Sequence, residues 1–289
     1  MDLSFFVIQV LNGVQYGFLL FLVASGLTLI FGIMGVVNLA HGSFYMIGAY
    51  LAYWLASVTG SLFLAIVVGL ALSLLVGYVT ERLAIALLYS RDHLYQVLLT
   101  YGLILVFNEL QRLLWGNDVH GVAIPALLSG SIPLTENQSY PVYRIFMSAT
   151  CIAIAFGMYL VIQRTKLGMM IRAGADNREM VQLLGIDIRR LFAIVFSLGA
   201  ALAAFSGMIA VPISSVYPGM GEQVLIISFV VVVIGGIGSI KGAFVGAMLI
   251  GLADTFGRVL LPELSSIVVY ALMAAVLLFQ PRGLFGRSL

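Results

Sequence analysis

Long apolar stretches separated by short polar segments recur along the whole chain. A helix that crosses a membrane needs about 20 predominantly apolar residues, and stretches of roughly that length occupy most of the sequence. They lie at about residues 7–31, 38–57, 61–81, 95–115, 142–163, 191–213, 223–238, 243–258 and 265–280. The pattern predicts an all-α, polytopic transmembrane bundle of about eight or nine membrane segments, in one domain over residues 1–289.

Composition supports the membrane prediction. The chain is 62% hydrophobic and only 9% charged, with a mean hydropathy of +1.13, whereas about a quarter of the residues of a soluble domain are charged. The N-terminal stretch has neither a basic region nor a small-residue cleavage site, so we interpret it as a first span and not as a signal peptide. A single cysteine, Cys151, excludes a disulfide within the chain.

The basic residues are distributed unevenly between two loops. Residues 164–190 contain six of the 14 Lys and Arg residues, whereas residues 116–140 contain none. An excess of Lys and Arg marks cytoplasmic loops, so we expect the first loop inside the cell and the second outside it. The C-terminal tail, with Arg282 and Arg287, is also expected to be cytoplasmic.

Two glycine-rich segments resemble each other and interrupt the apolar pattern. "MGVVNLAHGSF" (34–44) aligns with "IGGIGSIKGAF" (234–244). The alignment pairs Gly35 with Gly235, His41 with Lys241, Gly42 with Gly242 and Phe44 with Phe244. Matching glycine-interrupted segments in two halves of a membrane protein point to the site of a transporter, although chance similarity between apolar windows is the alternative.

The repeat predicts broken or re-entrant segments, because unwound backbone is tolerated only where protein or water satisfies it. We expect breaks between Gly35 and Gly42 and between Gly235 and Gly242, facing a shared polar cavity. The candidate substrate-path residues are Asn38, His41, Gly42, Ser43, Gly235, Gly238 and Gly242. An intramembrane histidine is a functional candidate, but His41 has a second interpretation as a hydrogen-bonding partner of the broken backbone at Gly42. Lys241 is expected to extend to the cytoplasmic face.

Small residues four positions apart predict close helix packing. Three such sets occur: Gly13 with Gly17, Gly199 with Ala203 and Gly207, and Gly238 with Gly242 and Gly246. Two charged pairs, Asp254 with Arg258 and Glu109 with Arg112, are spaced for structural ion pairs on a helix.

The basic loop contains the pattern of a short amphipathic helix, "RAGADNREMVQLLGIDIRR" (172–190). Asp176 followed by Glu179 fits a capping box, and Gly185 is a typical helix stop. Met180, Leu183 and Leu184 form an apolar face at i, i+3 and i+4. A helix this short is marginal in water, so it needs a surface: its own membrane domain, lipid headgroups or a cytoplasmic partner.

No pattern indicates catalysis. The serines lack a nearby histidine and acid, no phosphate-binding G-x-x-x-x-G-K-[ST] occurs, and His93 and His120 lack metal-ligand spacing around them. The prediction is a transport protein that is not an enzyme, with no cofactor, no metal and no nucleic-acid partner. A glycine-rich solute channel is an alternative, but a channel does not need a docking helix.

Three regions together resemble the Liv-type permeases, the membrane subunits of ABC importers for branched-chain amino acids. They are "GLTLIFGIMGVVNLAHGSFYMIGAYLA", "RAGADNREMVQLLGIDIRRLFAIVFSLGAALAAFSGMIA" and "VVVVIGGIGSIKGAFVGAMLIGL". The first region is more similar to the first of the two paired Liv permeases than to the second. Relatives that carry urea, short amides and other small organic solutes look similar, so the resemblance is less specific for the substrate.

The resemblance implies a complex in a bacterial or archaeal cytoplasmic membrane. Its other parts would be a second, homologous permease, two cytoplasmic ATPases that bind the ATP, an extracytoplasmic solute-binding protein and surrounding lipid. It also implies that residues 172–187 form a coupling helix seated in a cleft of an ATPase. The residues expected to serve this coupling are Arg172, Asp176, Glu179, Met180, Leu183, Leu184 and Gly185.

Overall fold

The computed structural model of the chain describes residues 3–89, 91–135 and 138–286, so Arg287 lies outside the described residues. The elements, in order, are α1 (Leu3–Met34), α2 (His41–Thr59), α3 (Leu62–Leu83), η1 (Ile85–Leu88), α4 (His93–Trp115), η2 (Ala126–Leu128), β1 (Ser131–Thr135), β2 (Gln138–Pro141), α5 (Val142–Arg164), α6 (Lys166–Asp176), α7 (Arg178–Leu183), α8 (Ile188–Ala210), α9 (Met220–Gly235), α10 (Ile240–Leu260), η3 (Pro262–Leu264) and α11 (Ser265–Phe279).

Within the described residues, six helices are long and apolar enough to cross a membrane, namely α1, α3, α4, α5, α8 and α10. The apolar helices α9 and α11 are shorter. The chain is therefore a polytopic helical membrane protein, as predicted.

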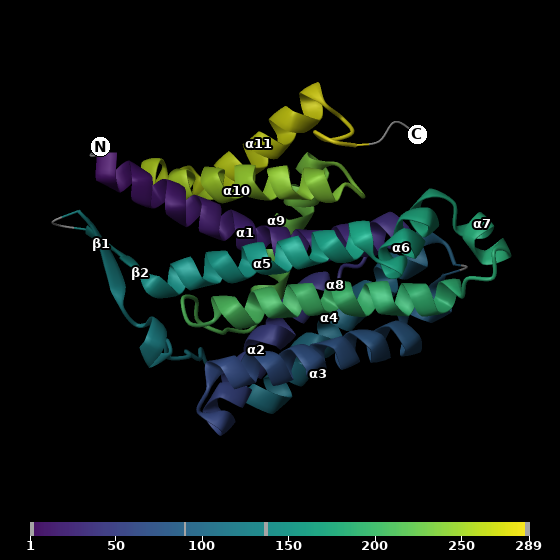
Figure 1. The fold of residues 1–289 in the computed structure, drawn as a ribbon, viewed down its shortest axis with the longest axis horizontal. Helices are drawn as coiled ribbons and strands as arrows, with labels where there is room; N and C mark the ends of the chain where they lie inside the picture. Colours follow the sequence, from purple (N-terminus) through teal and green to yellow (C-terminus); the bar gives the residue numbers. More distant parts are fainter. Residues whose placement is uncertain (1–2, 90, 136–137, 287–289) are drawn as a thin grey trace.

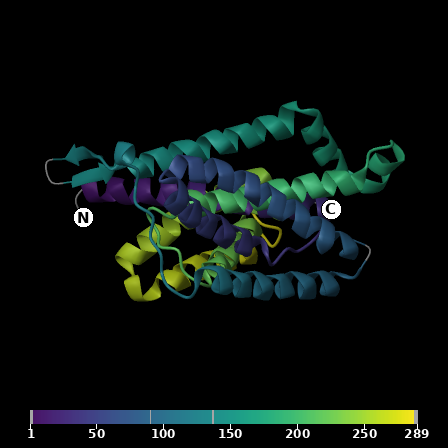
Figure 2. The same cartoon turned by 90° about the horizontal axis from the view of Figure 1, so that it is seen from below.

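The helices run roughly along the longest axis of the molecule (Figure 1). We call the end that carries β1 and β2 the hairpin end, and the end that carries α6, α7 and the tail after α11 the α7 end. The view from below shows the same two ends, with the N-terminus near the hairpin end (Figure 2). Because α7 and the C-terminal tail share one end, the two segments predicted to be cytoplasmic lie together.

The prediction of an all-α protein is wrong in one place. Strands β1 and β2 pair antiparallel, with Ser131 opposite Pro141 and Ile132 opposite Tyr140. Prolines in a strand weaken the sequence signal, because a proline cannot donate to the strand ladder and is found at strand edges. The short strands therefore resembled an irregular loop.

Helices α1 and α8 form the centre of the bundle, and most of their residues are buried, whereas most residues of α3, α4 and α5 are half-buried or exposed. The predicted small-residue motifs make the close contacts. On α1, Gly13 and Gly17 lie against the backbone of α10 at Gly251, and Gly26 meets Gly199 of α8. The same kind of contact joins Gly207 to Tyr45 and Gly246 to Val231. A side chain at these positions would separate the backbones, which explains the glycines.

Candidate functional site

The first predicted break is an extended segment, residues 35–40, between α1 and α2. Helix α1 ends at Met34 because Gly35 takes a φ of +65°, which favours glycine. Helix α2 begins at His41, whose Nε2 lies 2.9 Å from the carbonyl oxygen of Val23. Val23 precedes Gly35 by 12 residues, or about 18 Å of helix. The segment therefore folds back along α1 before α2 starts.

Helix α2 consequently begins inside the bundle. A Cβ on Gly26 would contact both Gly199 and the ring of His41, and Gly199 is the central residue of α8. His41 thus lies near the middle of the bundle along its long axis. The predicted interruption between Gly35 and Gly42 is confirmed.

The polar residues of this break are buried within the chain. Asn38 and His41 have no exposed surface, and Ser43 has 3%. The side-chain oxygen Oδ1 of Asn38 accepts a hydrogen bond from the Ala40 amide at 3.1 Å, and the His41 ring reaches Val23 of α1, not the backbone at Gly42. Asn38 Nδ2 and His41 Nδ1 have no hydrogen-bond partner among the described residues. A role of these residues in a substrate path stays a prediction.

The start of α2 meets the start of α9. A Cβ on Gly42 would overlap the carbonyl oxygen of Gly221 and lie 2.7 Å from the Cβ of Leu225. Helix α9 begins after Gly219, which has a φ of +80°. From this contact the two helices run to opposite ends of the bundle. Helix α2 ends beside residues 121–127 at the hairpin end, and α9 ends beside the C-terminal tail at the α7 end. Two helix N-termini therefore lie together near the middle of the bundle.

The extended segment runs between α4 and α9. Ala40 belongs to a small buried cluster with Ile104 of α4 and Leu225 of α9. Nearer the α7 end, the hydroxyl of Thr100 lies 3.5 Å from the carbonyl oxygen of Val37. Residues 35–40 therefore join the end of α1 to both α4 and α9.

The second predicted break is a tight turn between α9 and α10. Gly236 and Gly238 have φ values of +98° and +80°, and the Ser239 side chain accepts a hydrogen bond from the Gly242 amide at 3.1 Å. Gly235 and Gly242 touch backbone to backbone. The two repeat segments therefore differ in depth, because this turn stays near the α7 end. The role of Gly235, Gly238 and Gly242 in a substrate path stays a prediction.

The two breaks are neighbours at the α7 end. A Cβ on Gly32, near the end of α1, would lie 3.4 Å from the Cα of Gly238. The C-terminal tail covers the second turn: the amides of Leu284 and Phe285 donate to the last two carbonyls of α9, at 2.8 and 3.0 Å. Lys241 is exposed there, and its extension to the cytoplasmic face stays a prediction.

The predicted cytoplasmic loop contains two helices, α6 and α7, where the sequence indicated one. Asn177 caps α7, accepting a hydrogen bond from the Met180 amide at 2.9 Å, so the predicted cap at Asp176 is wrong. Asp176 is the last residue of α6, whereas Asn177 has the extended backbone that a cap requires. Gly185 ends α7 with a φ of +83°, as predicted.

The apolar face of α7 points away from the bundle. Val181 is buried, but Met180, Leu183 and Leu184 are 54%, 82% and 73% exposed. Arg178 lies over the first break, since a Cβ on Gly35 would be 3.1 Å from its Nη2. Helix α7 therefore contacts the extended segment on one side and presents leucines on the other.

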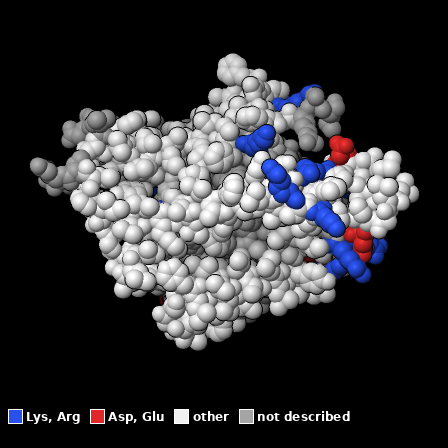
Figure 3. Space-filling view, viewed as in Figure 1, with Lys and Arg blue, Asp and Glu red and all other residues white. Residues whose placement is uncertain are grey.

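Charged side chains surround α7. Lys and Arg gather towards the α7 end, over α6 and its neighbours, whereas the rest of this face is nearly free of charge (Figure 3). The six basic residues of residues 164–190 are exposed, as are Asp176 and Glu179. Arg172 donates a hydrogen bond to the Ile162 carbonyl at the end of α5, so it holds α6 against α5.

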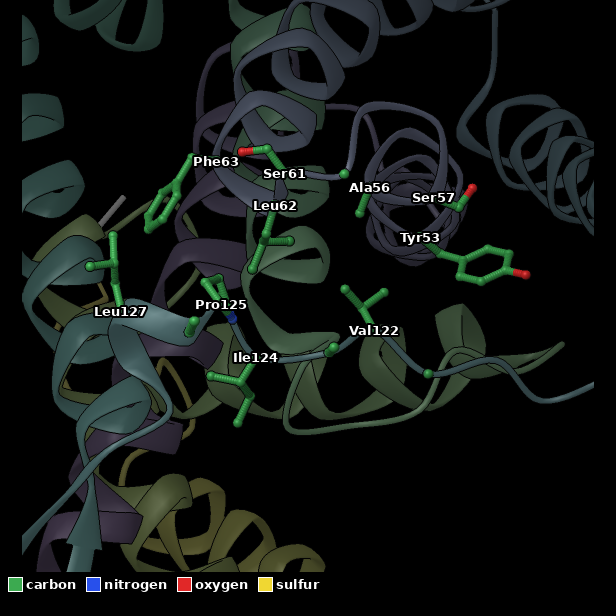
Figure 4. A pocket seen from close by; sticks show the side chains of 14 residues that line it. Tyr53, Ala56, Ser57, Ser61, Leu62, Phe63, Val122, Ile124, Pro125 and Leu127 are labelled. Carbon is green, nitrogen blue, oxygen red and sulfur yellow. The ribbon is translucent and has the colours of Figure 1, made fainter.

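A cavity of about 550 Å³ that the sequence did not predict lies at the hairpin end, between the end of α2, the start of α3 and residues 121–127 (Figure 4). Beside it, Tyr53 stacks on His120 with ring centroids 4.3 Å apart. Much of its wall is irregular loop, which has no periodic sequence pattern. The cavity opens at the end predicted to face outside.

The predicted ion pairs form. Arg258 Nε lies 2.8 Å from Asp254, and Arg112 lies 2.6 Å from Glu109. No group of three or more His, Cys, Asp or Glu residues suited to a metal ion occurs within residues 3–89, 91–135 and 138–286.

Comparisons with known proteins give a consistent result over nearly the full length. The family described as branched-chain amino acid transport system, permease component, matches residues 9–277. The high-affinity branched-chain amino acid transport system permease protein BraD of Pseudomonas aeruginosa is 34% identical over 294 residues, covering 96% of this chain and 95% of that protein. The corresponding permease protein LivH of Escherichia coli is 30% identical, covering 98% and 96%.

More distant proteins also match. A probable branched-chain amino acid transport permease protein LivH of Methanocaldococcus jannaschii is 29% identical, covering 96% of this chain and 92% of that protein. The fructose import permease protein FruF of Bifidobacterium longum is 26% identical, covering 80% and 65%. No solved structure matches the chain significantly.

Proposed function

The chain belongs to the family of permease components of branched-chain amino acid transport systems, and from this premise we propose that it forms one side of the path through which an ABC importer moves a branched-chain amino acid into the cell. A permease component is a non-catalytic transport subunit. Separate subunits would hydrolyse the ATP, and a second permease would form the other side of the path.

The observation that carries the coupling part of this proposal is the exposed face of α7. Met180, Leu183 and Leu184 are apolar side chains at the end of the bundle where basic residues gather. Exposed apolar patches rimmed by polar residues mark interaction sites. We assign this face to a cytoplasmic ATPase, because the chain's own bundle leaves it uncovered and α7 is connected through Arg178 to Gly35.

The same geometry supports a way to transmit movement. When an ATPase displaces α7, the contact of Arg178 with Gly35 would carry the displacement to the extended segment. That segment contacts α4 and α9 through Ala40. Movement at the α7 end could then change the opening between α4, α9 and the second permease, near the middle of the membrane.

The proposed topology follows from the charge distribution. The α7 end would lie in the cytoplasm and the hairpin end outside, in the cytoplasmic membrane of a bacterium or archaeon. An extracytoplasmic binding protein would dock at the hairpin end, beside the cavity that Tyr53 and residues 121–127 line. With this topology, nine helices of the described residues, the six long apolar ones together with α2, α9 and α11, would cross or enter the membrane.

The test combines Leu184→Ser with Gly185→Ala in the complete transporter. The first change removes an apolar contact, and the second disfavours the positive φ that ends α7. We expect ATP-dependent leucine uptake to fall about tenfold or more and the ATPases to co-purify less, with normal membrane insertion. Leu87→Ala, which changes a leucine 71% exposed at the same end but outside α7, is the control and should transport normally. Normal uptake by the double variant would contradict the assignment.

A further inference from the structure

A carboxylate lies on the outside of the bundle near its middle. Glu222 is in the first turn of α9 and is exposed. Its Oε1 accepts a hydrogen bond of 2.8 Å from Nδ2 of Asn108 on α4. The next residue, Gln223, is also exposed and accepts a hydrogen bond of 2.8 Å from the hydroxyl of Tyr217. The first turn of α9 thus presents two polar side chains outwards.

The depth of Glu222 follows from contacts already described. Its neighbour Gly221 touches Gly42, and the adjacent His41 lies beside Gly26 and Gly199, the central residue of α8. Glu222 is therefore near the level at which lipid tails would surround an outward-facing side chain. Ionisable residues at this depth face a bundle interior or a water-filled cavity, because a carboxylate in hydrocarbon is strongly unfavourable. This face of α4 and α9 consequently does not face lipid.

The partners of Glu222 leave it able to bind a cation. Among the described residues, its second carboxylate oxygen accepts no hydrogen bond, and no Lys, Arg or His lies within ion-pair distance of it. Asn108 contributes a neutral amide, which positions the carboxylate without neutralising it. The negative charge of Glu222 is therefore uncompensated by this chain.

Apolar side chains lie next to the carboxylate. Ile104 of α4 and Leu225 of α9 belong to one small buried cluster with Ala40, one turn from the hydrogen bond between Asn108 and Glu222. One turn along each helix, Leu105 and Ile226 are 54% and 50% exposed. Since residues three or four apart share a helix face, these two side chains flank the polar pair on its side towards the α7 end.

We infer that this face lines the substrate path, and that the Glu222 carboxylate binds the ammonium group of a zwitterionic amino acid while Leu105 and Ile226 contact its aliphatic side chain. The inference rests on the proposed function, because it assigns a ligand to the path that the permease would form. A charge-assisted hydrogen bond supplies the affinity for the ammonium group, and the apolar neighbours favour a branched aliphatic group over a polar one.

Water access is the first test, in the complete transporter with Cys151→Ala in this chain. A cationic methanethiosulfonate reagent reacts with a thiol in water but not with one facing lipid. We expect the thiol of Glu222→Cys to be labelled. The control is Leu75→Cys, because Leu75 is 57% exposed on α3 and lies close to Gly77, which contacts Ala200 at the same depth. Labelling is scored on this chain after the subunits are separated.

The second test separates charge from hydrogen bonding at the same position. Glu222→Gln can still accept the hydrogen bond from Asn108 but has lost the charge, whereas Glu222→Asp keeps the charge. We expect leucine uptake to fall about tenfold to hundredfold with Glu222→Gln and no more than about threefold with Glu222→Asp. In the Glu222→Cys protein, a sulfonate-bearing methanethiosulfonate should restore part of the uptake, and an ammonium-bearing one should not.

The outcomes discriminate between the two proposals. A wild-type complex that takes up no leucine contradicts the proposed function. The labelling experiment then still reports whether water reaches the face of α4 and α9 that carries Glu222. If the wild type takes up leucine and Glu222→Gln does so equally well, the ammonium site is overturned. It is also overturned if the thiol at position 222 is as unreactive as the one at position 75, or if it reacts only when the second permease is absent.

Discussion

Replacing Gly42 by alanine tests the close contact between α2 and α9. The added Cβ would overlap the carbonyl oxygen of Gly221 and lie 2.7 Å from the Cβ of Leu225. Ordinary contacts of this kind begin at 3.4 Å, so the helices must separate by several tenths of an ångström at least. The neighbouring atoms are backbone and a Cβ, which cannot rotate away.

The expected energy is the sum of two opposite effects. Overpacking of a well-packed core costs about 1–3 kcal/mol, and the rigid backbone contact places Gly42→Ala near the top of that range. Alanine is favoured over glycine within a helix by about 1 kcal/mol. The net destabilisation is therefore about 2 kcal/mol, which corresponds to a fall in Tm of about 4–8 °C for a chain of this size.

The assay is thermal unfolding of the purified transporter, with leucine uptake measured in parallel. Gly102→Ala is the matched control, because Gly102 lies in the helix α4 and a Cβ there meets nothing within 4 Å. The control should leave the Tm unchanged or raise it, whereas Gly42→Ala should lower the Tm and slow uptake. If both variants have the same Tm, the contact between α2 and α9 does not carry the energy assigned to it.

Three further predictions follow from the site and the topology. His41→Gln should keep uptake within about threefold, because an amide can still donate to the Val23 carbonyl, whereas His41→Leu should destabilise the protein by about 1–3 kcal/mol; equal thermal stabilities would argue against that bond. With Cys151→Ala, a thiol at Ser131 should react with an impermeant reagent in whole cells once the outer barrier is opened, and one at Ala175 should not; the reverse would overturn the topology. Gly283→Val should lower the Tm by a few degrees, because Gly283 has a φ of +76° and lies against the second turn; an unchanged Tm would show that the tail contributes no stability.

The apolar pattern along the sequence was sufficient to predict the helices. Every predicted span corresponds to a helix whose ends differ by only a few residues, for example 61–81 against Leu62–Leu83. The charge asymmetry and the glycine stop at Gly185 were also readable, since both depend on local chemistry. The capping residue was not, because Asp176 and Asn177 are both good caps and only the preceding helix α6 decides between them.

The sequence could not predict how deep a residue lies within the bundle. The predicted span 223–238 began just after Glu222, and that residue was not considered as a site. Its position near the middle depends on the contact of Gly221 with Gly42, two residues that are 179 positions apart in the chain. Similarly, the repeat predicted two breaks, but only tertiary contacts make one a deep segment and the other a shallow turn.

The deep start of α2 has a consequence for biosynthesis. Helix α2 is absent from the helices apolar enough to cross a membrane by composition, and its first turn is buried against α9, which the ribosome makes more than 150 residues later. At roughly 5–20 residues per second, α2 would wait on the order of ten seconds or more for that partner. During this interval its glycine face would need shelter within the insertion machinery, so we expect early truncations that end before α9 to be degraded.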